Sequence, residues 1–116
     1  AEVYNWLENQ SQQKFFAWIH LYDPHTPYDP PEPYKTEYRG RLFGLYDGEI
    51  AYVDQLMGEF RDFMEKKDLM DKTLIIFTAD HGESLGEHRE FHGIGQEVEK
   101  SLKNQISLVS LSQKSD

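Results

Sequence analysis

The sequence predicts an α/β fold with a mostly parallel sheet, because two apolar runs are joined by one amphipathic helix. The runs Phe15–Leu21 and Thr73–Ala79 are short and almost wholly apolar, which is typical of strands buried on both faces in a parallel sheet. A strand, a crossover helix and a second strand form a βαβ unit. We therefore expect the two strands to be parallel neighbours.

The predicted helix runs from Leu45 to about Leu69, where apolar residues recur at steps of four and three. This spacing places one apolar stripe on the core and leaves charged residues such as Glu49 facing solvent. The stripe consists of Tyr46, Ile50, Val53, Met57, Phe60 and Met64. The segment 29–41 before the helix is rich in Pro and charge, which predicts an extended loop. This loop either lines the entrance to a substrate site or only covers the outer surface of the fold.

Polar residues follow both apolar runs at their carboxyl ends. Asp80 and His81 follow the second run, and His25 follows the first in a loop stiffened by Pro24 and Pro27. Because open α/β sheets bind ligands at this edge, we expect the three side chains to lie close together. A carboxylate beside an imidazole suits a divalent metal. The alternatives are that Asp80 caps a helix and that His25 is a solvated loop residue.

Composition limits the classes of partner. The chain has 116 residues, a formal net charge of -9 and 0 Cys. This acidic balance argues against nucleic-acid binding, and the hydropathy predicts no membrane span in this segment. The length permits one domain with a modest core and open sheet edges.

Two motifs and the helix between them resemble the sulfatase family of the alkaline-phosphatase superfamily. They are Asp23-Pro24-His25-x-Pro27-Tyr28, Tyr46-Asp47-Gly48-Glu49-Ile50, and Thr78-Ala79-Asp80-His81-Gly82-Glu83-x-Leu85-Gly86-Glu87-His88. The resemblance implies a fragment of an alkaline-phosphatase-like three-layer α/β/α sandwich. Residues 1–95 would be the central part of the catalytic domain. Residues 96–116 would be an extension of uncertain register with a disordered end. Within it the residues leave two alternatives: a helix with Val98, Leu102, Ile106 and Val109 on one face, or a strand at Ile106–Leu111.

The resemblance also implies roles for individual residues. Asp80 and His81 would bind the metal, with Ca²⁺ first and Mn²⁺ or Mg²⁺ as alternatives. His25 would be catalytic and contact the sulfate ester, and His92 would contact the same anion. His88 would either act on the sulfate ester or orient the loop that contains the metal ligands Asp80 and His81. The substrate would be a sulfated small molecule or glycan, and the enzyme would be periplasmic, secreted or lysosomal in type.

The sequence also departs from the family pattern. The family's nucleophile, a formylglycine made from Cys or else a Ser, belongs to an N-terminal motif that this chain lacks. An Asp-Asp metal pair is missing as well. We therefore expect a sulfatase segment with no activity on its own. The alternatives are a phosphonate or phosphate monoester hydrolase or phosphotransferase, and a non-catalytic acidic module that binds a partner or calcium.

Overall fold

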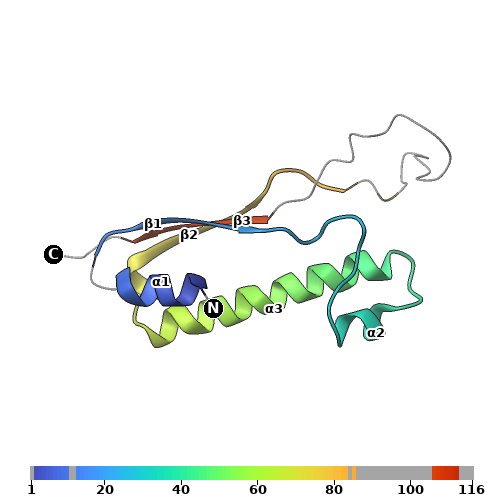
Figure 1. The fold of residues 1–116 in the computed structure, drawn as a ribbon. Helices are drawn as coiled ribbons and strands as arrows, with labels where there is room; N and C mark the ends of the chain where they lie inside the picture. Colours follow the sequence, from blue (N-terminus) through green and yellow to red (C-terminus); the bar gives the residue numbers. More distant parts are fainter. Residues whose placement is uncertain (1, 11–12, 84, 86–105, 113–116) are drawn as a thin grey trace.

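The structure is a computed structural model that describes residues 2–10, 13–83, 85 and 106–112, the last range by its backbone alone. Helices α1 and α3 lie on one face of a three-stranded sheet (Figure 1). The elements in chain order are α1 (Glu2–Gln10), β1 (Phe16–Leu21), α2 (Tyr34–Tyr38), α3 (Gly44–Lys66), the 3₁₀ helix η1 (Met70–Lys72), β2 (Thr73–Ala79) and β3 (Ile106–Ser112). No helix within the described ranges is long and apolar enough to cross a membrane.

The sheet has the order β1-β3-β2, and β3 runs antiparallel to both of its neighbours. The expectation that β1 and β2 are direct neighbours is therefore wrong, because the tail strand lies between them. Of the helix and the strand that the sequence left open for the tail, the strand is the one found at Ile106–Ser112. Since both outer strands oppose β3, they run in the same direction, about 10 Å apart at the usual strand spacing.

The sheet is covered on one face by the described helices. On the other face Phe16 and Trp18 are each 60% exposed and Leu74 is 58% exposed. The expectation of strands buried on both faces is therefore wrong for this part of the chain. Exposure alternates along β1 because successive side chains point to opposite faces of a strand. The described residues form two layers of the expected three-layer sandwich.

The apolar core lies where the second half of α3 meets α1 and the sheet. Its buried members are Leu7, Phe15, Phe60, Met64 and Leu69. Aromatic pairs extend it: Tyr4 packs on Phe63 with ring centroids 4.7 Å apart, and Trp6 meets Phe15 edge-on. The predicted stripe is confirmed in this half of the helix, where Phe60 and Met64 are 6% and 0% exposed.

The first half of α3 packs instead against α2 and the loop after β1. A Cβ at Gly44 would lie 2.0 Å from the Tyr38 carbonyl oxygen, and one at Gly48 would lie 2.9 Å from Cγ of Pro30. Both glycines therefore permit close backbone approach. The predicted extended loop at 29–41 is wrong in its middle, where residues Tyr34–Tyr38 form α2.

Candidate active site at the sheet edge

The carboxyl ends of β1 and β2 lie at the same edge of the sheet. Leu21 and Ala79 both pair with Ile106 of β3, so the loops holding His25 and Asp80 leave the sheet together (Figure 1). The sequence predicts that the ends of both strands lie at one edge of the sheet, and the strand pairing confirms this. The two strands are not direct neighbours, because β3 lies between them. The two loops also lie near each other: burial chiefly raises the pKa of the Tyr28 hydroxyl, and the charge of Glu83 on the second loop raises it further.

The loop that contains His25 is held by the carboxylate of Glu49. The backbone N–H of His25 donates to Oε2 at 2.9 Å, and that of Asp29 donates to Oε1 at 2.6 Å. Glu49 is only 3% exposed, so its predicted place on the solvated face is wrong. The sequence held a signal for this position. Glu49 lies four residues before Val53, which places it on the buried stripe of α3.

Burial raises the pKa of the Glu49 carboxyl above its ordinary value. The backbone N–H groups of His25 and Asp29 oppose this shift, since they bind the ionised form. The charge of Asp23 raises the pKa further, whereas His25 lowers it. Glu49 thus places a buried negative charge directly behind the His25 loop.

The His25 side chain has one engaged nitrogen and one without a partner. Its Nδ1 lies 2.5 Å from the Thr26 carbonyl oxygen, which can only accept, so the geometry assigns a proton to Nδ1. The ring stacks on Tyr22, with centroids 4.2 Å apart. Its Nε2 is buried and has no hydrogen-bond partner among the described residues. Such an atom is uncommon in native proteins, and a catalytic role is one of the recognised explanations for it.

Asp80 and His81 form a close pair directly after β2. The backbone N–H of His81 donates to Asp80 Oδ1 at 3.0 Å, and His81 Nε2 lies 3.5 Å from Asp80 Oδ2. The Asp80 side chain is 44% exposed and that of His81 is 18% exposed. Residues 81–83 are not helical, so Asp80 does not cap a helix in this stretch.

The donor types of this pair fit part of a divalent-metal site. A carboxylate and an imidazole are both metal ligands, but the described residues gather no group of three or more potential ligands. Calcium takes about six to eight oxygen ligands, so the pair alone would leave most of its coordination to water. His88 and His92 lie outside the described residues.

Comparisons with known proteins agree on one family. A family model for sulfatases matches residues 1–111. Arylsulfatase K of Gallus gallus is 33% identical over 97 residues, which are 75% of this chain and 18% of that protein. Human iduronate 2-sulfatase is 31% identical over 62 residues, covering 53% of the chain and 11% of the enzyme.

A third relative comes from the wider superfamily. The multifunctional alkaline phosphatase superfamily protein PehA of Trinickia caryophylli is 41% identical over 59 residues, covering 51% of the chain and 12% of that protein. No solved structure matches the chain. The chain spans less than a fifth of the length of these relatives. Because the family model covers almost the whole sequence, the chain belongs to the sulfatase family and shares its α/β fold.

Proposed function

We propose that this chain contributes to the active site of a hydrolase that cleaves sulfate monoesters. The observation that supports this proposal most directly is the buried, unpartnered Nε2 of His25. It lies in a loop that leaves the sheet at the same edge as Asp80 and His81. The sulfate ester would occupy the space beyond this edge.

His25 would act on the ester through Nε2. In the imidazolium form this nitrogen donates a hydrogen bond to a sulfate oxygen, or a proton to the departing alcohol oxygen. The Thr26 carbonyl fixes the ring through Nδ1, and the Glu49 carboxylate accepts the backbone N–H of His25 at 2.9 Å. Glu49 is therefore a positioning residue for the loop that contains His25.

Asp80 and His81 would hold the divalent metal, with Ca²⁺ favoured and Mn²⁺ or Mg²⁺ as alternatives. When bound, the metal supplies Lewis-acid stabilisation of the ester's negative charge. His92 would be a second contact to the sulfate. The nucleophile, a formylglycine or Ser in the family, would come from parts of the fold beyond this chain, which contains no Cys.

The test is hydrolysis of an aryl sulfate by the complete protein that contains this chain. We expect His25→Ala to lower kcat about 10²–10⁴-fold, the usual contribution of a general acid. The control is His20→Ala, which changes an exposed histidine of β1 and should leave turnover near normal. Unchanged kcat in the His25 variant would show that this ring does not take part in the reaction.

The metal assignment has its own measurement. Asp80→Ala should reduce both the metal content and the activity of the complete protein. By contrast, the 116-residue chain alone should show no turnover and only weak metal affinity, because it offers few ligands. Affinity of the chain tighter than about micromolar (about 8 kcal/mol) in a calorimetric titration would contradict the two-ligand assignment.

A second candidate is hydrolysis of phosphate or phosphonate monoesters, favoured by the 41% identity with PehA. Higher kcat/KM for an aryl phosphate or phosphonate than for the matching aryl sulfate would establish this alternative. A third candidate is a non-catalytic acidic module. Metal-dependent thermal stabilisation without hydrolysis of any of these esters would favour that function.

A further inference from the structure

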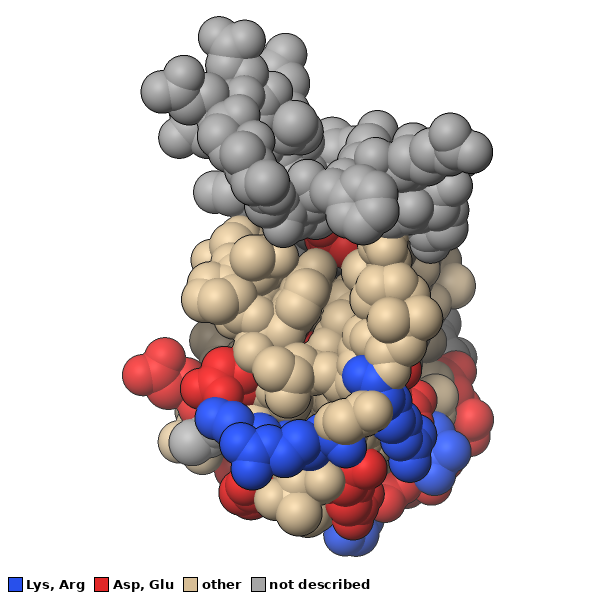
Figure 2. All heavy atoms as spheres, turned by 90° about the vertical axis from the view of Figure 1, so that its right-hand side faces the viewer, with Lys and Arg blue, Asp and Glu red and all other residues tan. Residues whose placement is uncertain are grey.

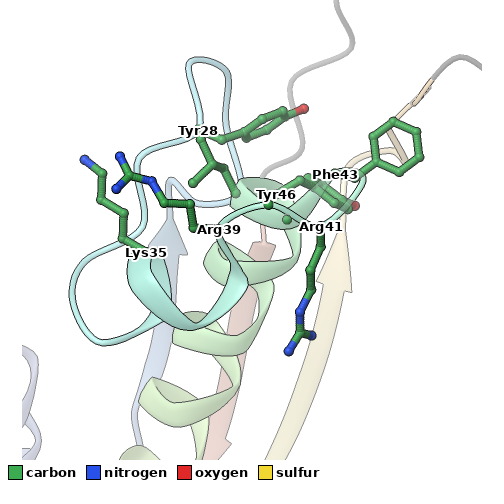
Figure 3. Close-up of a pocket in the computed structure, with 9 residues that line it drawn as sticks. Tyr28, Lys35, Arg39, Arg41, Phe43 and Tyr46 are labelled. Carbon is green, nitrogen blue, oxygen red and sulfur yellow. The ribbon is translucent and has the colours of Figure 1, made fainter.

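Two arginines at the α2 end of the molecule point away from each other. Figure 2 shows Lys and Arg side chains in a band across this end. A pocket of about 430 Å³ lies there, where α2 meets the start of α3. Figure 3 shows the side chains of Arg39 and Arg41 pointing in opposite directions, so their charges do not act together on one ligand. The groups around His25, by contrast, converge on a single side chain.

His25 is held by groups that are fixed in the fold. Its backbone N–H donates to Glu49 Oε2 at 2.9 Å, and Glu49 is only 3% exposed. Its Nδ1 lies 2.5 Å from the backbone carbonyl oxygen of Thr26. Pro24, the residue before His25, is fully buried. Displacement of any of these groups would require the backbone of the loop to move.

Tyr22 contacts the same imidazole ring from the solvent side. The two rings stack with centroids 4.2 Å apart and with 24° between their planes. Because Tyr22 is 57% exposed, its ring lies between the imidazole and solvent. An exposed side chain changes rotamer within picoseconds to nanoseconds. Tyr22 can therefore leave the stack while the loop that contains His25 stays in place.

The stack offers a reason why Nε2 of His25 has no contact with water. This atom is buried and lacks a hydrogen-bond partner among the described residues. Such a state is unfavourable, because the atom has lost water without gaining another partner. An ester oxygen would supply the partner, but it can reach Nε2 only after a neighbouring group moves aside. Tyr22 is the exposed neighbour, whereas Glu49 and Pro24 are buried.

We propose that Tyr22 is a further residue of the candidate active site, which acts through His25 as a movable cover. With the Tyr22 ring stacked, Nε2 is shielded from water. With the ring turned aside, Nε2 can contact an oxygen of a sulfate monoester. Opening the cover weakens ester binding by the fraction of molecules that are open. The cover follows from the described contacts, whereas its role in ester entry rests on the proposed function.

The first test measures access to Nε2 in the full 116-residue chain. Diethyl pyrocarbonate modifies accessible, unprotonated imidazole nitrogens, and tandem mass spectrometry locates the modified histidine. At about pH 8, where an unperturbed histidine is neutral, His25 should react more slowly than the exposed His20. Tyr22→Ala should raise the His25 rate about 2- to 12-fold, the value of one aromatic pair. Equal rates for His20 and His25 in the unmodified chain would overturn the cover.

Two further variants show whether the Tyr22 ring itself is responsible. Tyr22→Phe keeps the ring and should keep the slow His25 rate. Tyr52→Ala is the matched control, because it removes a ring of the same size on α3, where Tyr52 faces Tyr34 with centroids 6.0 Å apart. It should leave the His25 rate unchanged. A His25 rate that stays slow in Tyr22→Ala would overturn the role of Tyr22.

A third measurement needs no variant. Cross-relaxation between the ring protons of Tyr22 and His25 should be visible in NMR spectra of the unmodified chain, because the centroids lie 4.2 Å apart. Its absence would overturn the stack on which the cover depends.

The kinetic test uses the complete protein and an aryl sulfate. Tyr22→Ala should raise kcat/KM about 2- to 12-fold through a lower KM, with kcat unchanged, because no binding energy is used to open the cover. Tyr22→Phe should restore the KM of the unmodified protein. A lower kcat in Tyr22→Ala would mean that Tyr22 holds His25 during the reaction, and a higher KM would mean that it contacts the ester. Either result would overturn the cover.

The modification and kinetic tests separate the cover from the proposed function. If the complete protein hydrolyses no sulfate ester while the His25 rates follow expectation, the proposed function fails and the cover stands. If the ester is hydrolysed but the His25 rate does not respond to Tyr22→Ala, the cover fails and the proposed function stands.

Discussion

The two ends of α3 are held in place by different interactions. At its C-terminal end, Phe60 and Met64 are buried in the apolar core. At its N-terminal end, Gly48 packs on Pro30, and the buried Glu49 carboxylate holds the loop of His25. Ile50, which belongs to the predicted apolar stripe, is 40% exposed there. The helix thus stabilises the fold with one end and positions a candidate catalytic loop with the other.

This difference matters because the two kinds of interaction respond differently to change. Apolar burial has no preferred direction and scales with the area removed from water. A buried carboxylate that accepts two backbone N–H groups fixes their position, but it depends on pH and tolerates little substitution. Changes at the C-terminal end should therefore reduce stability, and changes at the N-terminal end should also displace the His25 loop.

The largest effect is expected from Phe60→Ala in the apolar core. Loss of a buried phenyl group and the cavity left behind should lower the free energy of unfolding by about 3–5 kcal/mol. Urea unfolding followed by circular dichroism measures this change. Phe16→Ala is the matched control, since Phe16 is 60% exposed. A similar loss in both variants would mean that the core does not lie where α3 meets α1.

A smaller effect is expected from Glu49→Gln. The amide group has one acceptor oxygen for two backbone donors, so one N–H of the loop loses its acceptor and the other keeps only an uncharged one. We expect a loss of about 1.5–3 kcal/mol, together with shifts of the His25 and Asp29 amide signals in NMR spectra. Unmoved signals at both positions would refute the positioning role of Glu49.

The same variant tests the pKa of Glu49. Its folded pKa is raised above the ordinary value of 4.5, so the folded state binds the proton more tightly than the unfolded state. This stability contribution is fully present below pH 4.5 and is lost as the pH rises through the folded pKa. The stability of the unmodified chain relative to Glu49→Gln should therefore fall as pH increases across that window. A difference that rises with pH would show that the pKa is lowered instead.

The smallest of the three effects is expected from Gly48→Ala. The added methyl group would lie 2.9 Å from a ring carbon of Pro30, which is itself fully buried, and overpacking of this kind costs about 1–3 kcal/mol. Gly58→Ala is the control, because nothing lies within 4 Å of a Cβ at that position of the same helix. It should stabilise the chain by up to about 1 kcal/mol through helix propensity. Equal stability of the two variants would argue against the contact between α3 and the loop.

Much of the fold follows from local pattern. The runs that became β1 and β2 and the long helix between them are visible in the sequence, because side-chain periodicity reports directly on burial. The insertion of β3 between the two strands is not visible, because strand pairing depends on distant residues. The short helix α2 was also missed. Three prolines close together suggested an extended chain, yet the carbonyls of Pro31 and Pro33 accept hydrogen bonds from Lys35 and Glu37.

From the sequence, the candidate site can be predicted only for residues that directly follow a predicted strand. His25, Asp80 and His81 follow apolar runs, so their placement at one sheet edge could be inferred. The amphipathic pattern predicts Glu49 on the solvated face, because a charged residue in such a helix usually lies there. Its true environment depends on two backbone donors of a loop, which lie 20 and 24 residues away in sequence. Periodicity contains no information about such partners.

The uncovered face of the sheet has an optical consequence. The chain contains two tryptophans, and Trp18 on that face is 60% exposed, whereas Trp6 meets Phe15 on the helix side. An indole in water emits at longer wavelength than one in an apolar environment. With Trp6 replaced by Phe, the fluorescence of Trp18 would therefore report hydration of the uncovered face, and any molecule settling on it would shift the emission to the blue.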